Sequence, residues 1–170
     1  MPLYEATIPQ LSKVLRNVDR WLEKTSAFAA AQSIDEAALL AERLAPDQFP
    51  LVKQVQAACD QAKTVAALLS GKEAPKHPDT EKTIEELRAR IKTCRSYLET
   101  ITAADFAGAE SRPISLPFLP GKVITGANYL NEMALPNFYF HVTTAYAILR
   151  HKGLGLGKRD FIGGLTLADP

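Results

Sequence analysis

The chain has 170 residues, of which 46% are hydrophobic and 23% are charged. This length is typical of one domain and is enough to bury a substantial core, so we expect a single domain over residues 1–170. The formal net charge is +1, from 20 basic and 19 acidic side chains. No run of lysine and arginine follows one face either, so the charge argues against nucleic acid or an anionic membrane surface as a partner.

The first residues, MPLYEATIPQLSK, lack the basic start and the unbroken apolar run of a signal peptide. No apolar stretch of the sequence is long enough to span a bilayer. Cys59 and Cys94 have no CxxC spacing, and each falls on an apolar helical stripe, which favours buried core thiols over reactive ones. We therefore predict a cytoplasmic protein with reduced cysteines and no membrane partner.

Apolar residues recur three and four positions apart in the first part of the chain, which predicts amphipathic helices. The first helix is expected over about residues 7–28, with Pro9 in its first turn. The second should follow APDQFP, with Asp47 as its N-cap and Pro50 in its first turn. Gly71 is well placed to end it.

A third helix is predicted to start within HPDTEKT, with Asp79 or Thr80 as its cap and an apolar stripe that reaches Ile101. Its glutamates come early and its basic residues later, as the helix dipole favours. These charged side chains are predicted to form a solvated surface rather than a binding patch: Glu81, Glu85, Glu86, Arg88, Arg90, Lys92 and Arg95.

Residues 112–127, RPISLPFLPGKVITGA, break the helical pattern. Prolines exclude a helix, and two short apolar runs flank the turn dipeptide Pro120-Gly121, so we expect a β-hairpin or an extended flap. Such a segment either covers a site or connects elements across one end of the molecule. The glycine-rich tail that follows Gly153 is predicted to be extended.

The last predicted helix covers about residues 135–152 and ends at Gly153. It has almost no polar face, so it must be covered by the flap, the tail or another subunit, and we expect self-association. Together, the pattern predicts an all-α fold, an antiparallel four-helix bundle with a short β-hairpin or flap before the last helix. Sites in such bundles form where polar side chains point inward.

Two of the three histidines lie on this last helix. His141 and His151 are separated by about 15 Å of rise and about 280° of rotation, so they cannot share a metal ion. His151 belongs to the helix end, where it can interact with exposed carbonyls, and His77 lies in a proline-flanked loop that we expect to be exposed. That leaves His141 alone as an inward-facing candidate, either a ligand or a hydrogen-bonded structural group.

No catalytic motif in the sequence accompanies His141. GLGLGK follows a helix rather than a strand and lacks the Ser or Thr of a phosphate loop. Ser111 and Ser115 have no GxSxG context, and no HExxH or ExxH pair occurs.

The stretch ALPNFYFHVTTAYAILRHKGLGLGKRDFIG, with RLAPDQFPLVKQVQAACDQAK and GKEAPKHPDTEKT, resembles a bacterial family known only as a domain of unknown function. That family belongs to the DinB/YfiT-like superfamily of metalloenzymes. The resemblance covers nearly the whole chain. It implies an up-down-down-up four-helix bundle that is often a homodimer.

The resemblance also implies a divalent-metal site, built from one His on the second helix and two His one turn apart on the fourth. Some members are thiol-dependent transferases or isomerases. His141 matches the second of the two fourth-helix histidines, whereas the first falls on Asn137. The second-helix ligand would fall near Val55 or Gln56. The chain thus keeps one of three expected ligands.

Three hypotheses follow. In the first, which requires no cofactor, the bundle binds a small molecule in a pocket lined by His141, Asn137, Gln56, Tyr139 and Tyr146, with residues 112–127 as a lid. In the second, the chain is a degenerate metal-dependent transferase, in which Asn137, Gln56 and waters complete a weak divalent-metal site around His141. In the third, it is a structural module that acts through its dimer surface. We favour the first or the third over catalysis.

Overall fold

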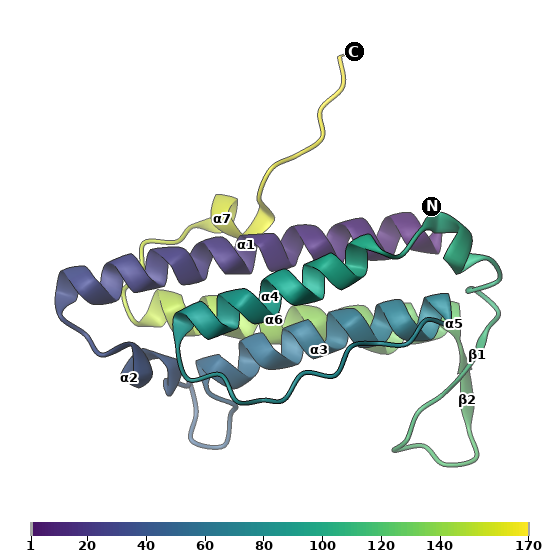
Figure 1. The fold of residues 1–170 in the computed structure, drawn as a ribbon, viewed down its shortest axis with the longest axis horizontal. Helices are drawn as coiled ribbons and strands as arrows, with labels where there is room; N and C mark the ends of the chain where they lie inside the picture. The colour runs from purple at the N-terminus through teal and green to yellow at the C-terminus, as the bar shows by residue number, and fades with distance from the viewer. Residues whose placement is uncertain (1, 170) are drawn as a thin grey trace.

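The computed structural model describes residues 2–169, and the chain is mostly helical, as predicted. Long helices lie side by side along the molecule (Figure 1). Their bounds are α1 (Leu3–Gln32), α3 (Leu51–Ser70), α4 (Ile84–Glu99) and α6 (Leu135–His151). The α3 helix packs most extensively against α6, and α1 packs most extensively against α4. Since α3 also contacts α4 and α1, it is covered on several sides.

Short elements connect and flank these helices. The predicted hairpin is present, because β1 (Pro113–Ser115) and β2 (Val123–Thr125) pair antiparallel with Ile114 opposite Ile124. It extends from the end of the molecule where α3 stops (Figure 1). The other short elements are α2 (Glu36–Leu40), the 3₁₀ helix η1 (Ala103–Phe106), α5 (Gly126–Asn128), the π-helical segment η2 (Tyr129–Ala134) and α7 (Lys158–Ile162).

The starts of the first two long helices differ from the prediction. The α1 helix begins earlier than expected, so Pro9 lies inside it rather than in its first turn. Pro9 is exposed, and the carbonyl of Glu5 that its missing N–H leaves free can bind water. Asp47 does not cap α3. Instead Pro50 occupies the N-cap position, because the preceding loop folds back and the Leu51 N–H donates to the Glu42 carbonyl at 2.8 Å.

The cap of α4 is also displaced from the predicted position. Thr83 caps the helix, in a capping box in which its hydroxyl accepts from the Glu86 N–H and the Glu86 carboxylate accepts from the Thr83 N–H. Thr80 lies before this cap, and Asp79 instead forms an ion pair with Lys53 at 2.9 Å. The predicted stop of α3 is confirmed, because Gly71 takes the left-handed conformation with φ of 76°.

The last long helix has the predicted bounds to within one residue, but α5 and η2 lead into it without a break. Pro136 lies in the first turn of α6 and lacks the N–H that a regular α-helical ladder would need there. A π-helical stretch before a proline is one way to continue a helix past that missing bond.

The glycine-rich tail is not wholly extended, because it contains α7. That short helix packs against α1, where the Trp21 indole donates to the Asp160 carbonyl at 3.1 Å and the Asn17 amide donates to the Phe161 carbonyl at 3.0 Å. The rings of Trp21 and Phe161 stack with centroids 5.7 Å apart. The hydrogen bonds and aromatic contacts hold α7 in place.

Both cysteines lie in the core, as predicted, and the Cys94 thiol donates to the Cys59 carbonyl at 3.3 Å. The neighbouring Cys94 thiol and burial raise the pKa of Cys59 well above its ordinary value. Within residues 2–169, no helix has the length and apolarity needed to cross a membrane.

Candidate functional site

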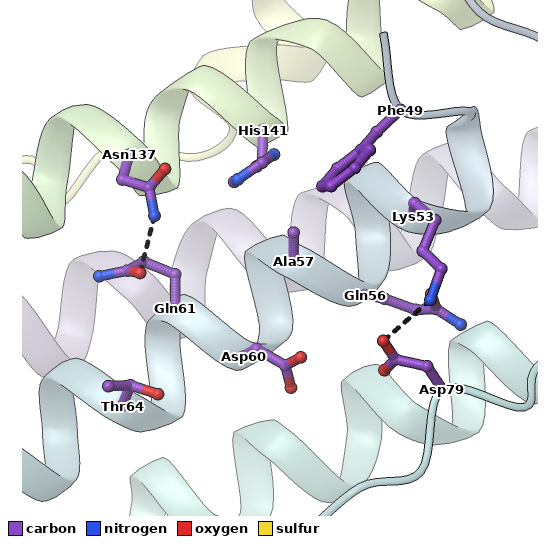
Figure 2. Close-up of a pocket in the computed structure, with 10 residues that line it drawn as sticks. All are labelled: Phe49, Lys53, Gln56, Ala57, Asp60, Gln61, Thr64, Asp79, Asn137 and His141. Carbon is purple, nitrogen blue, oxygen red and sulfur yellow. Dashed lines mark hydrogen bonds and ion pairs between the residues drawn. The ribbon is translucent and has the colours of Figure 1, made fainter. Parts of the chain in front are cut away.

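A pocket of about 390 Å³ lies between α3, α6 and the segment that leads to α4 (Figure 2). Its walls come from parts of the chain that are far apart in sequence, so its shape depends on the packing of α3 against α6. The lining residues are Phe49, Lys53, Gln56, Ala57, Asp60, Gln61, Thr64, Asp79, Asn137 and His141.

Two polar residues of α6, one helical turn apart, bind two glutamines of α3. The His141 ring nitrogen Nδ1 lies 2.8 Å from Gln54 Oε1. Asn137 Nδ2 donates to Gln61 Oε1 at 2.8 Å, as Figure 2 shows. His141 and Asn137, which the sequence placed on one face of the last helix, therefore both contact α3. Their partners, Gln54 and Gln61, were not among the residues predicted to line a site.

The surroundings of His141 define which ring nitrogen carries its proton. Gln54 Nε2 donates to the Phe49 carbonyl at 3.0 Å, so the other end of this amide, its oxygen, faces His141. An amide oxygen only accepts, and Nδ1 must therefore be protonated. Burial lowers the pKa of His141, which favours the neutral ring. In that tautomer Nε2 carries a lone pair and is a hydrogen-bond acceptor.

Aromatic rings flank the imidazole. The Phe49 ring lies nearly parallel to it, at 12° and with centroids 6.4 Å apart, and the Phe140 ring meets it edge-on at 5.3 Å. Both phenylalanines are more than half exposed. Phe49, which lines the pocket, places an accessible apolar surface beside its polar groups.

A buried ionic network stands behind the α3 side of the pocket. The Arg90 side chain is 1% exposed and binds Asp60 at 2.6 Å, Asp79 at 3.0 Å and Glu81 at 3.0 Å. Lys63, itself 9% exposed, adds a second cation 2.8 Å from Asp60. Arg90 was predicted to be part of a solvated surface. It is instead buried, because the segment before α4 folds over it.

These contacts favour the ionised forms of Asp79 and Glu81. Hydrogen bonding to Lys53, together with Arg90, holds the pKa of Asp79 below its ordinary value. Burial raises the pKa of Glu81, but hydrogen bonds from Arg90 and Gln56 outweigh it and lower the pKa overall. Asp79 and Glu81 therefore stay charged at neutral pH and hold the segment before α4 against α3.

Three of the five pocket residues named from the sequence line this pocket, namely His141, Asn137 and Gln56. Tyr146 lies elsewhere, against Trp21 at a centroid distance of 5.5 Å. Tyr139 packs edge-on against its own neighbour Phe138. The reason is helical geometry, since at 100° per residue both tyrosines point well away from the face that carries His141.

The hairpin and His77 also differ from the expectation. No residue of the hairpin lines this pocket, so the 112–127 segment is not a lid over it. His77 is half-buried rather than exposed, with Nδ1 3.2 Å from the Lys63 ammonium. Burial, and then Lys63, lower the pKa of His77.

The donor set does not fit the divalent-metal site that the resemblance implies. His141 is its one imidazole. The other fourth-helix position holds the Asn137 amide, and the second-helix position falls on the apolar Val55 or on the Gln56 amide; both amides are already bound to a neighbour. Among residues 2–169, no three His, Cys, Asp or Glu side chains are grouped so as to hold a metal ion. Amides are weak ligands for transition metals, so these residues do not make up the implied site.

A family model described as a domain of unknown function, DUF1993, matches residues 3–162. The chain belongs to the DUF1993 family. It is also similar to the crystal structure of a DinB family member protein from Shewanella denitrificans, with 48% identity and a TM-score of 0.95 over 99% of this chain and 96% of that one. The predicted resemblance is thus confirmed, and the DUF1993 chain has a DinB-like fold. No curated protein matches it.

Proposed function

We propose that the protein binds a small polar molecule in the pocket between α3 and α6, without an intact metal site. One observation carries the proposal. Gln56 is 2% exposed, and its Nε2 donates to Glu81 at 2.7 Å, yet its Oε1 is buried without a hydrogen-bond partner among the described residues. A buried unpaired acceptor costs roughly 1–3 kcal/mol, which a ligand that donates to it would recover.

The pocket's dimensions and chemistry support this proposal. A volume of about 390 Å³ is within the range of small-molecule sites. Its polar groups are held by hydrogen bonds and ion pairs to buried partners, so they are fixed before a ligand arrives. Preorganised polar groups lose little entropy on binding.

A fragment screen followed by ¹⁵N NMR tests the proposal, because the side-chain amides of Gln56, Gln61 and Asn137 give their own signals. We expect at least one fragment class to shift these signals together. Gln56→Met keeps the side-chain length and removes the unpaired acceptor, and it should weaken the binding of such a fragment about fivefold. Gln10→Met, at an exposed position of α1, is the control.

Two outcomes would contradict the proposal. One is a set of fragments that bind only elsewhere on the chain or not at all. The other is zinc or nickel binding near one equivalent that disappears in His141→Ala, because this would favour the degenerate metalloenzyme.

We also propose that the chain is a single domain whose long helices form an up-down-down-up four-helix bundle. The directions in which α1, α3, α4 and α6 run in Figure 1 support that order. We place the protein in the bacterial cytoplasm, since both cysteines are free and buried.

Self-association is the remaining part of the proposal. Exposed apolar side chains gather on the hairpin, where Phe118 is 62% and Val123 68% exposed. We expect a homodimer by light scattering at micromolar concentration, and Phe118→Ser with Val123→Ser should weaken it. Leu167→Ser, at an apolar position that is 83% exposed and lies outside the hairpin, is the control. A monomeric wild-type chain under these conditions would contradict self-association.

A further inference from the structure

We propose that the ligand of this pocket is a small organic cation with several N–H donors, an alkylguanidinium or alkylammonium. The inference rests on the proposed function and adds the chemical class of the ligand. It follows from the hydrogen-bonding direction of those groups on the pocket-lining residues that have a donor or acceptor site without a partner among the described residues.

Asp60 supplies an open carboxylate oxygen. Its Oδ1 receives both cations behind it, the Arg90 guanidinium at 2.6 Å and the Lys63 ammonium at 2.8 Å. No hydrogen bond or ion pair among the described residues reaches Oδ2, and the side chain is 40% exposed on the pocket wall. Figure 2 shows this carboxylate extending from α3 toward the side of the pocket on which Asp79 lies.

Gln56 supplies a second acceptor. Its amide orientation is fixed, because Nε2 must face the Glu81 carboxylate at 2.7 Å, which can only accept. The other end of the amide is therefore an oxygen, and it is the buried atom without a partner. A ligand that brings a donor satisfies it, whereas a ligand that brings an acceptor does not.

His141 supplies a third acceptor. The Gln54 oxygen accepts from Nδ1 and so fixes the proton there, which leaves a lone pair on Nε2. Asn137 adds its Oδ1, since its Nδ2 is bound to Gln61. In Figure 2 that oxygen lies on the side of Asn137 nearer to His141.

Open donors are fewer. The Lys53 ammonium lines the pocket and gives one of its three N–H donors to Asp79 at 2.9 Å. Gln61 Nε2 is a buried donor without a hydrogen-bond partner among the described residues. The cations behind the pocket are not accessible from it, since the Arg90 side chain is 1% exposed and Lys63 9%. An anionic ligand would find the Lys53 and Gln61 donors, but it would also face the Asp60 oxygen and the lone pairs of the other acceptors. A guanidinium or ammonium group would meet acceptors, with the accessible Phe49 ring able to receive a cation on its face.

The buried network is balanced once the half-exposed Lys53 is included, since Arg90, Lys63 and Lys53 then face Asp60, Asp79 and Glu81. Cation selectivity therefore depends on the open Asp60 oxygen and not on a net negative field. The experiment must accordingly separate charge from donor number.

The test compares N-butylguanidinium, N-butylurea and pentanoate, which share a short alkyl chain, by NMR titration of the full chain. We expect N-butylguanidinium to bind at least about fivefold more tightly than N-butylurea, and pentanoate to leave the pocket signals unmoved. Asp60→Asn keeps the side-chain shape and should abolish the preference for the charged probe. Asp19→Asn, which removes a carboxylate paired with Arg88 on the far side of α4, is the matched control.

Because Asp60→Asn also touches the buried network, Asn137→Asp provides a second readout. It adds a carboxylate beside His141, and it should strengthen N-butylguanidinium binding by about threefold or more. Equal affinity for the guanidinium and urea probes, or tighter binding of pentanoate, would overturn the cation class. If none of the three probes binds while other fragments shift the pocket amides, the cation class fails and the proposed function stands.

Discussion

At the scale of single residues, Arg90 holds the segment before α4 to the rest of the chain. Its guanidinium binds Asp60 and Glu81 and lies 3.3 Å from the Pro78 carbonyl. Arg90→Met would leave carboxylates without their buried cation, so we expect the free energy of unfolding to fall by about 3 kcal/mol or more. Urea denaturation followed by circular dichroism measures it.

Arg88 is the matched control, because it lies on the same helix and also forms ion pairs. Its side chain is 29% exposed, and it binds Asp19 at 2.8 Å on an open face. We expect Arg88→Met to cost about 1 kcal/mol or less, as exposed pairs do. If the two variants lost equal free energy of unfolding, the stabilising role assigned to the buried Arg90 would be contradicted.

The polar groups of the pocket could be predicted from the sequence only in part. The apolar period places His141 and Asn137 on one face of a helix, which needs no tertiary information. It does not reveal that Gln54 and Gln56 are both buried, since the α3 stripe passes through Val55 between them. They are buried because α3 packs against α6 on one side and against α4 on another. The apolar period of α3 predicts one buried face and cannot show that a second face is also covered.

At the scale of elements, α7 shows how tertiary contacts decide what sequence propensity leaves open. A helix of five residues cannot be stable alone, and a glycine-rich stretch predicts none. Hydrogen bonds to Trp21 and Asn17, with the Lys24–Asp160 ion pair at 2.6 Å, hold it on α1. The existence of the long helices and the hairpin was predictable from local pattern, whereas the caps depend on the folded loops.

Gly163 is the position where this docking is most sensitive. It has φ of 71°, and a Cβ there would lie 2.6 Å from the Asn17 amide nitrogen. Gly163→Ala should therefore detach α7 from α1 and cost about 1–3 kcal/mol. The only tryptophan of the chain, Trp21, reports the change through its fluorescence.

Gly164→Ala is the control, since a Cβ at Gly164 meets nothing within 4 Å. We expect its emission spectrum and melting temperature to match the wild type. An unchanged Trp21 spectrum in Gly163→Ala would contradict the role assigned to this glycine.

Two histidines of the folded chain, His77 and His141, lie in sites that disfavour their charged form. Burial, Lys63 and Arg90 lower the pKa of His77 from 6.5, although Asp60 and Glu81 act in the opposite direction. Burial lowers the pKa of His141 in the same way. The unfolded chain then binds more protons than the folded one, so stability rises with pH across this window.

The consequence is a specific pH profile. Stability should be fully present above about pH 6.5 and should fall as the pH drops below that value toward the depressed pKa values of the folded state. His77→Gln removes one of the two groups, so the loss of stability between pH 7 and 5 should become smaller. Urea denaturation at each pH measures the profile. If the wild-type stability instead rose as the pH dropped through this window, the neutral state of the two half-buried histidines would be contradicted.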